Sequence, residues 1–118
     1  MAVLSSIPEL SSVREAIARC REAQSDLWEA VKSLSRWEVY TDGSAPIKNP
    51  GGPIGFSSVF LVNGHAWEVF GGTEGRTKEP PTSNNRAEIA GVLTILEVLY
   101  TLSTSGESLP REIEIVCD

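Results

Sequence analysis

The stretch WEVYTDGS, residues 37–44, decides how the rest of this 118-residue sequence is interpreted. Its first five residues alternate as a half-buried strand does, and Asp42 follows them. Two other acids occupy comparable places: Glu88 lies where a long apolar helix is expected to begin, and Asp118 follows a strand-like run at 113–117. Carboxylates at the ends of two strands and the start of a helix can meet at one point. Hard oxygen ligands of this kind favour Mg²⁺ or Mn²⁺.

Each of these acids also has an explanation that involves no chemistry. Asp42 and Gly43 fit a turn after a strand, and Glu88 stands three residues after Asn85, which is the spacing of a helix capping box. Asp118 is the last residue of the sequence, where an acid is common. These explanations do not account for all three acids falling where an element enters one end of a sheet, so the metal-site hypothesis is preferred.

Length and composition predict one folded domain with an added arm. Apolar residues make up 41% of the chain, and no apolar run is long enough to span a bilayer. The first residues lack the features of a secretory signal, and Cys20 and Cys117 are far apart. We therefore expect a cytoplasmic protein with reduced thiols and no membrane partner. The net charge of −6 argues against binding nucleic acid through a basic surface, but leaves open a substrate approached through metal ions.

The sequence pattern predicts an α/β fold with a mixed sheet. Strands are expected at 37–42, 55–62, 65–71 and 112–118, and an apolar, centrally buried helix at 85–101. Asn63-Gly64 predicts a two-residue hairpin turn, because a type I′ turn needs positive φ at both central positions. Three antiparallel strands are then followed by a right-handed crossover, which places the fourth strand parallel to the first.

Residues 1–36 are predicted to form a helical N-terminal arm, and residues 37–118 the domain that carries the acids. Pro8 suits a first helical turn, and Ser12 with Glu15 has the spacing of a capping box. Apolar residues recur at helical spacing, which indicates packing on the domain or on a second copy, as in a dimerisation helix. The arm contains no chemical motif, so we expect it to be dispensable for the chemistry.

Five short motifs resemble those of one known family. They are YTDGS at 40–44, NPGG at 49–52, GG at 71–72, TSNNRAE at 82–88 and IVCD at 115–118. Together they resemble ribonuclease H of type 1, and the resemblance extends over residues 37–118. The first and fourth motifs are specific in combination and less so apart. The resemblance implies a ribonuclease H-like fold that is truncated here after the fourth strand.

The resemblance implies a metal-dependent endonuclease that cuts the RNA strand of RNA–DNA hybrids. The family holds two divalent ions with four carboxylates, using Mg²⁺ with Mn²⁺ as a substitute. Asp42, Glu88 and Asp118 match three of the four and are the expected catalytic residues; with Gly43 they form the expected metal site. One ion would activate water, and the other would stabilise the leaving 3′ oxygen. Gly43 and Ser44 are expected to bring main chain close to the sugar–phosphate, where the 2′-hydroxyl marks RNA.

The same resemblance implies further substrate contacts. Asn49 matches a position that contacts the RNA strand. Asn84 and Asn85 match positions that touch the DNA strand, although helix capping would also explain them. Ser83 stands where the family often has a threonine that binds phosphate.

The sequence departs from the family pattern in four places. The loop before Asn49 is one residue longer than usual, the glycine run reads GGPIG at 51–55, and the loop at 102–111 is extended. The chain also stops at Asp118, before the fifth strand, the later helices, the fourth carboxylate and the histidine-bearing loop. We therefore expect this chain alone to be weak or inactive, and to need a complementary C-terminal fragment or to self-associate. A non-catalytic module for nucleic-acid binding or assembly is the alternative function.

Overall fold

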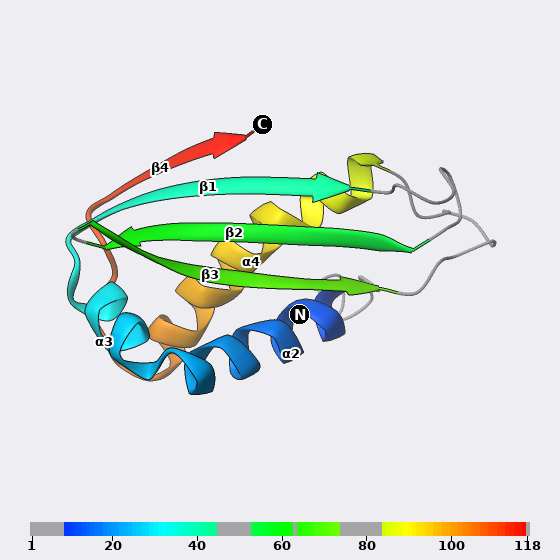
Figure 1. The fold of residues 1–118 in the computed structure, drawn as a ribbon. Helices are drawn as coiled ribbons and strands as arrows, with labels where there is room; N and C mark the ends of the chain where they lie inside the picture. The colour runs from blue at the N-terminus through cyan, green and yellow to red at the C-terminus, as the bar shows by residue number, and fades with distance from the viewer. Residues whose placement is uncertain (1–8, 45–52, 63, 74–83, 118) are drawn as a thin grey trace.

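The computed structural model describes residues 9–44, 53–62, 64–73 and 84–117, and within them the fold is a mixed α/β structure, as predicted (Figure 1). Two helices come first in the chain and a third lies between the third and fourth strands. In chain order the elements are α2 (Glu9–Ala23), α3 (Ser25–Ser33), β1 (Arg36–Ser44), β2 (Ile54–Val62), β3 (His65–Thr73), α4 (Asn84–Thr104) and β4 (Glu112–Cys117).

The sheet has the predicted topology. Its strand order is β3-β2-β1-β4, in which β1 and β2, and β2 and β3, are antiparallel while β1 and β4 are parallel. The predicted hairpin joins β2 to β3, because Val62 pairs with His65 across a two-residue connection. Gly64 has a φ of 88°, which is the positive value that the turn requires; Asn63 lies outside the described residues.

Several predicted boundaries were wrong by two or three residues. Gly43 and Ser44 were expected in a loop but belong to β1, where they pair with Phe56 and Gly55 of β2. The helix α4 was expected to end at residue 101 but continues to Thr104. It ends there because Gly106, with a φ of 73°, reverses the chain. The amides of Gly106 and of the next residue donate to carbonyls of the last turn, at Ser103 and Leu102, in a Schellman motif.

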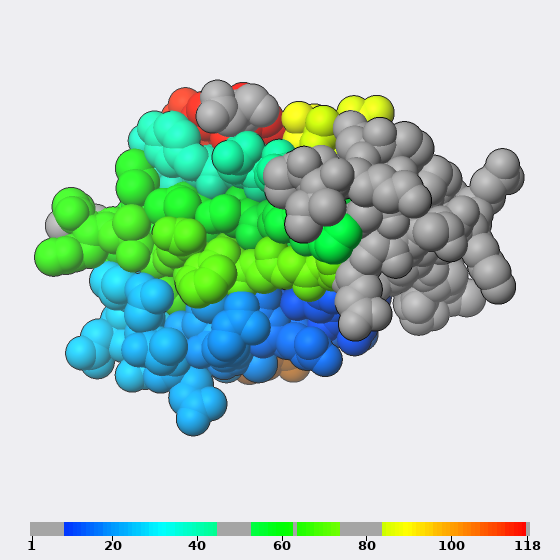
Figure 2. Space-filling view, turned by 45° about the vertical axis from the view of Figure 1, so that its right-hand side comes forward, coloured from blue at the N-terminus to red at the C-terminus, as the bar shows by residue number. Residues whose placement is uncertain are grey.

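The core lies between the sheet and the helices. The helix α4 crosses one face of the sheet over β1 and β2, and α2 packs on β3 and α4 (Figure 1). The aromatic part of this core is a chain of ring contacts from Trp28 on α3 through Trp67 and Phe60 to Trp37 on β1. The opposite face of β1 to β3 is exposed as a continuous surface, with α2 along its β3 side (Figure 2).

The N-terminal helices share this core. Leu10, Val13, Ala16, Ile17 and Cys20 of α2 are buried in the same cluster as the sheet residues. The capping box predicted at Ser12 was wrong, because Ser12 lies inside α2, which already includes Glu9. The apolar spacing of α2 is thus satisfied within this chain, by packing on the sheet and on α4.

The length of α4 corrects one expectation from composition. The helix α4 has 21 residues, and an 18-residue window within it has a mean hydropathy of 1.4, so it is long and apolar enough to cross a membrane by length and composition alone. Half of that apolar window is buried inside the protein, where α4 packs on β1 and β2. The core helix of a soluble fold meets the same criterion, so this property of α4 is weak evidence for a membrane span.

Truncating α2 at its buried face should destabilise the whole fold. Ile17→Ala removes a side chain that is 4% exposed, and we expect the free energy of unfolding to fall by about 2–5 kcal/mol. Glu15→Ala, on the exposed side of the same helix, should change it by less than about 0.5 kcal/mol. Urea unfolding of both variants measures the difference. Equal stabilities would mean that α2 is not part of the cooperative core.

Candidate active site

Gly43 brings the main chain of β1 against the first turn of α4. A Cβ atom at Gly43 would lie 2.5 Å from the carbonyl oxygen of Ala87 and 2.5 Å from the amide nitrogen of Glu88, so only glycine fits. Figure 1 shows this junction, where the start of α4 lies beside the end of β1. The YTDGS and TSNNRAE motifs, which are far apart in the sequence, therefore meet at this point of the fold.

The side chain of Asp42 lies on the exposed face of the sheet. Its neighbours Thr41 and Gly43 both face α4, and side chains alternate along a strand, so Asp42 points away from α4. Its carboxylate accepts a hydrogen bond from the amide of Gly43 at 2.8 Å. Across the strands Asp42 pairs with Ser57, and Ser57 pairs with Phe70. These residues contribute to an open pocket of about 300 Å³ that is lined by Asp42, Gly43, Ser44, Gly55, Phe56, Ser57, Phe70 and Gly71.

Glu88 lies at the start of α4 beside the end of β4. It is exposed and lines a second open pocket of about 540 Å³, together with Asn85, Ile89, Val92 and Cys117. Cys117 is the last residue of β4 and pairs with Thr41, whose hydroxyl donates a hydrogen bond to its sulfur at 3.4 Å. Glu88 is therefore close to Cys117, the last described residue of β4, and to its pairing with Thr41 of β1.

The predicted convergence of three acids stays a prediction. Asp42 and Glu88 line different pockets, and Asp118 lies outside the described residues. Within the described ranges, no group of three or more histidine, cysteine, aspartate or glutamate side chains is close enough to hold a metal ion.

Some of the predicted substrate residues lie within the described residues, and others lie outside them. Ser44 is exposed at the end of β1, and Asn84 and Asn85 are exposed in the first turn of α4, the turn that also carries Glu88. Asn49 and Ser83 lie outside the described residues. The fold thus brings four predicted polar residues, together with Gly43, to the junction of β1 and α4.

Electrostatic interactions on the exposed face are dominated by Arg36. It pairs with Glu114, Glu112 and Glu38, and the hydrogen bond that Arg36 donates to Glu114 is the main reason why the pKa of Arg36 is raised. The hydroxyl of Tyr40 donates to Glu38 at 2.5 Å, which raises the pKa of Tyr40. These contacts compensate part of the acidic charge of the face on which Asp42 lies.

One functional candidate was missed by reasoning from the sequence. Arg86, two residues before Glu88, makes two hydrogen bonds to Glu9 of α2. The partners are 77 positions apart, and nothing in the local pattern around either residue links them.

Comparisons with known proteins agree with the motifs. No family model matches the chain. The ribonuclease H of Nitrosomonas eutropha is 35% identical over 74 residues, which are 63% of this chain and 41% of that protein. The ribonuclease H of Gluconobacter oxydans is 35% identical over 86 residues, which are 69% of this chain and 52% of that protein.

A solved structure supports the same relationship. The crystal structure of LC11-RNase H1 in complex with an RNA/DNA hybrid matches with a TM-score of 0.51 and 25% identity, covering 69% of this chain and 53% of that one. The chain thus spans about half the length of the relatives that it matches, or less. These comparisons confirm the resemblance that the motifs predicted: the chain is related to ribonuclease H and shares the fold of its type 1 members over about half of their length.

Proposed function

We propose that this chain supplies part of the active site of a metal-dependent endonuclease that cuts the RNA strand of RNA–DNA hybrids. The observation that carries the proposal is the contact of Gly43 with the backbone of Ala87 and Glu88, because it joins the two most specific motifs in one place. The relatives at 35% identity are named ribonuclease H, and the similar LC11-RNase H1 was crystallised with an RNA/DNA hybrid.

The residues present fit a hard divalent cation. Asp42 and Glu88 are exposed carboxylates that offer oxygen ligands, which suit Mg²⁺ and, as a substitute, Mn²⁺. We propose that Glu88, which lines a pocket with Cys117, binds these ions together with Asp42 and with Asp118, the residue that follows Cys117 in the sequence. The bound ions would activate water and stabilise charge on the phosphate and the leaving oxygen.

The residues of this chain would then orient the substrate. Gly43 and Ser44 offer main chain and a hydroxyl at the end of β1, beside which the sugar–phosphate of the RNA strand would lie. Asn84 and Asn85 would hydrogen-bond the DNA strand from the first turn of α4. Asn49 and Ser83 are also proposed to contact the substrate, and for these two residues the support is the resemblance of the motifs alone.

A complementary segment is expected to complete the domain. The four residues of β4 and α4 that expose apolar side chains are Ile89, Leu96, Tyr100 and Ile115, and β4 ends the described sheet without a neighbour on its outer side. Exposed sheet edges and apolar patches favour association. Because the relatives are about twice as long as the matched part, a C-terminal fragment that carries the fourth carboxylate is the proposed partner.

The test is a cleavage assay on a labelled RNA–DNA hybrid with Mn²⁺ or Mg²⁺. We expect the purified 118-residue chain to cleave weakly or not at all, and addition of the C-terminal half of a related ribonuclease H to restore cleavage. Asp42→Asn in the same mixture is the control against contaminating nuclease and should abolish the restored activity. Strong cleavage by the chain alone would contradict the need for a partner.

A second candidate function is a non-catalytic module that binds nucleic acid or assembles with other chains. The separate pockets of Asp42 and Glu88 favour this candidate. Hybrid binding that persists without divalent ions, with no cleavage in any mixture, would support it. Measurement of molar mass in solution distinguishes self-association from capture of the added fragment.

A further inference from the structure

An ion pair between two distant segments holds the turn of α4 that carries Glu88. Arg86 donates from Nε to Glu9 Oε1 at 2.7 Å and from Nη2 to Glu9 Oε2 at 2.8 Å. Two parallel hydrogen bonds between a planar guanidinium and a carboxylate fix orientation as well as distance. The first residue of α2 is thereby tied to the first turn of α4.

The burial of this pair makes it a strong constraint. The side chain of Glu9 is only 5% exposed and that of Arg86 is 22% exposed. A buried carboxylate requires its partner, because removal of one charge leaves the other without compensation. Any displacement of the first turn of α4 relative to α2 would break these two hydrogen bonds.

Three consecutive residues of this turn make contacts with three different elements. Arg86 binds Glu9, Ala87 is fully buried against Ile54, and the backbone of Glu88 contacts Gly43. The turn is therefore held by α2, β2 and β1. Glu88 remains exposed and projects into the pocket at the end of β4.

We infer that Glu9 is a positioning residue for the active site, acting through Arg86 on the turn that presents Asn85 and Glu88. What Glu88 does there rests on the proposed function, but its position depends on the fold alone. The inference changes the expectation for residues 1–36. These residues include no motif residue, yet their helix α2 holds in place the first turn of α4, which carries the motif residues Asn85 and Glu88.

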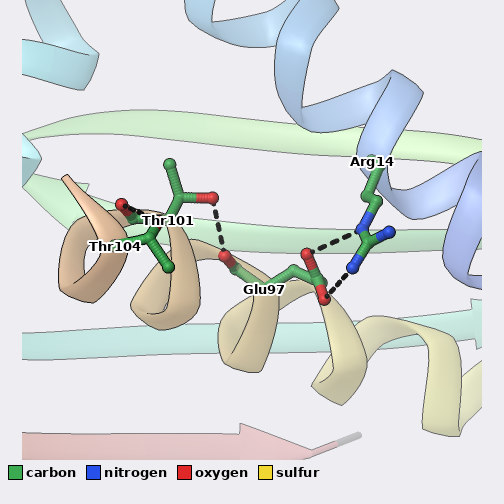
Figure 3. Close-up of polar contacts among 4 residues, drawn as sticks. All are labelled: Arg14, Glu97, Thr101 and Thr104. Carbon is green, nitrogen blue, oxygen red and sulfur yellow. Dashed lines mark hydrogen bonds and ion pairs between the residues drawn. The ribbon is translucent and has the colours of Figure 1, made fainter. Parts of the chain in front are cut away.

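The chain contains a matched control for this inference. The same two helices are joined by a second pair, in which Arg14 donates from Nε and Nη2 to Glu97 at 3.1 and 3.3 Å (Figure 3). Glu97 is also buried, at 7% exposed, and the hydrogen bonding that it accepts from Arg14, followed by its charge, raises the pKa of Arg14. It lies eleven residues beyond Arg86, about three helical turns from the proposed site.

The first test compares Glu9→Gln with Glu97→Gln in the full chain by amide hydrogen exchange and NMR. Glu9→Gln should speed exchange and shift the amide signals at 84–88, with exchange faster by about tenfold or more. Glu97→Gln should leave these amides unchanged. Equal effects of both variants at 84–88, or no effect of Glu9→Gln there, would overturn the inference.

Two further variants keep the test decisive. Arg86→Lys retains the charge but loses the geometry of two parallel hydrogen bonds, so we expect the same change in exchange and amide signals at 84–88, but a smaller one. This variant replaces Glu9→Gln in the comparison if Glu9→Gln does not fold. The double variant Glu9→Gln/Arg86→Gln should be no worse at 84–88 than Arg86→Gln alone, because both remove one interaction. Additive effects would show that Glu9 does not act through Arg86.

The second test uses the chain completed by the C-terminal fragment. Glu9→Gln should lower kcat for hybrid cleavage and raise the Mg²⁺ concentration needed for half-maximal rate, while Glu97→Gln should change neither. If the unaltered mixture neither cleaves hybrid nor binds Mg²⁺, the proposed function fails, whereas the exchange result at 84–88 still decides the positioning role. Unchanged kcat and Mg²⁺ dependence in Glu9→Gln, with active unaltered protein, would overturn that role.

Discussion

Glu88→Gln is expected to abolish metal-dependent cleavage in the completed domain while leaving the fold intact. Glutamine has nearly the same size and shape as glutamate, and Glu88 is exposed, so no buried interaction is lost. It lacks the negative charge that a divalent ion requires. Loss of several kcal/mol of transition-state stabilisation corresponds to a rate lower by roughly 10²–10³-fold or more. Hybrid cleavage at saturating Mg²⁺ measures the effect.

The control for this variant is Glu15→Gln, the same change on the exposed side of α2. Its cleavage rate should equal that of the unaltered chain, and circular dichroism should show both variants folded. A Glu88→Gln protein that retains most of its activity would mean that Glu88 does not bind the metal. The proposed metal site would then need a different acid.

The parts of the fold that sequence patterns predicted are those set by local signals. Alternation defined the strands, and the Asn63-Gly64 pair defined the hairpin between β2 and β3. The crossover through α4 then left the parallel pairing of β4 with β1 as the expected arrangement. Each of these predictions depends on residues that are neighbours in the sequence or on a general rule of chain connection.

The predictions that failed depended on contacts across the fold. Gly43 and Ser44 have the composition of a turn, but pairing with β2 keeps them in β1. Ser12 has the spacing of a cap, but it lies inside α2, which already includes Glu9. The ion pair of Glu9 with Arg86 has no local signal at all, because its two charges meet only after α2 and α4 have packed.

The motifs predicted site residues on several elements, and the described residues include those on β1 and at the start of α4. Motif residues on β1 and α4 meet at Gly43. The spacing of these residues along the sequence could not by itself have established this contact. Asp42 and Glu88 nevertheless line different pockets in this chain. Residue identity therefore indicated the chemistry, whereas the relative position of the two acids depends on how α4 packs on β1, which no local pattern predicts.

Gly43→Ala is expected to destabilise the protein and displace the proposed site together. The added methyl group would lie 2.5 Å from two backbone atoms of α4, the carbonyl oxygen of Ala87 and the amide nitrogen of Glu88. Backbone cannot rotate away as a flexible side chain can, so either β1 or the first turn of α4 must move. Overpacking typically costs about 1–3 kcal/mol, and we expect about 3 kcal/mol or more here.

Gly55→Ala is the matched control for this last prediction. Gly55 pairs with Ser44 in the adjacent strand, and among the described residues a Cβ there would approach only the carbonyl oxygen of Gly71, at 3.8 Å. Its stability should be unchanged or higher by up to about 1 kcal/mol, since alanine restricts the unfolded chain more than glycine does. Urea unfolding of the two variants gives the stability difference, and amide signals at 84–88 report whether α4 has moved. Because a typical domain is stable by only about 5–15 kcal/mol, the expected loss for Gly43→Ala is a large share of the total. Equal stabilities of the two variants would show that β1 and α4 are not in the close contact on which the proposed site depends.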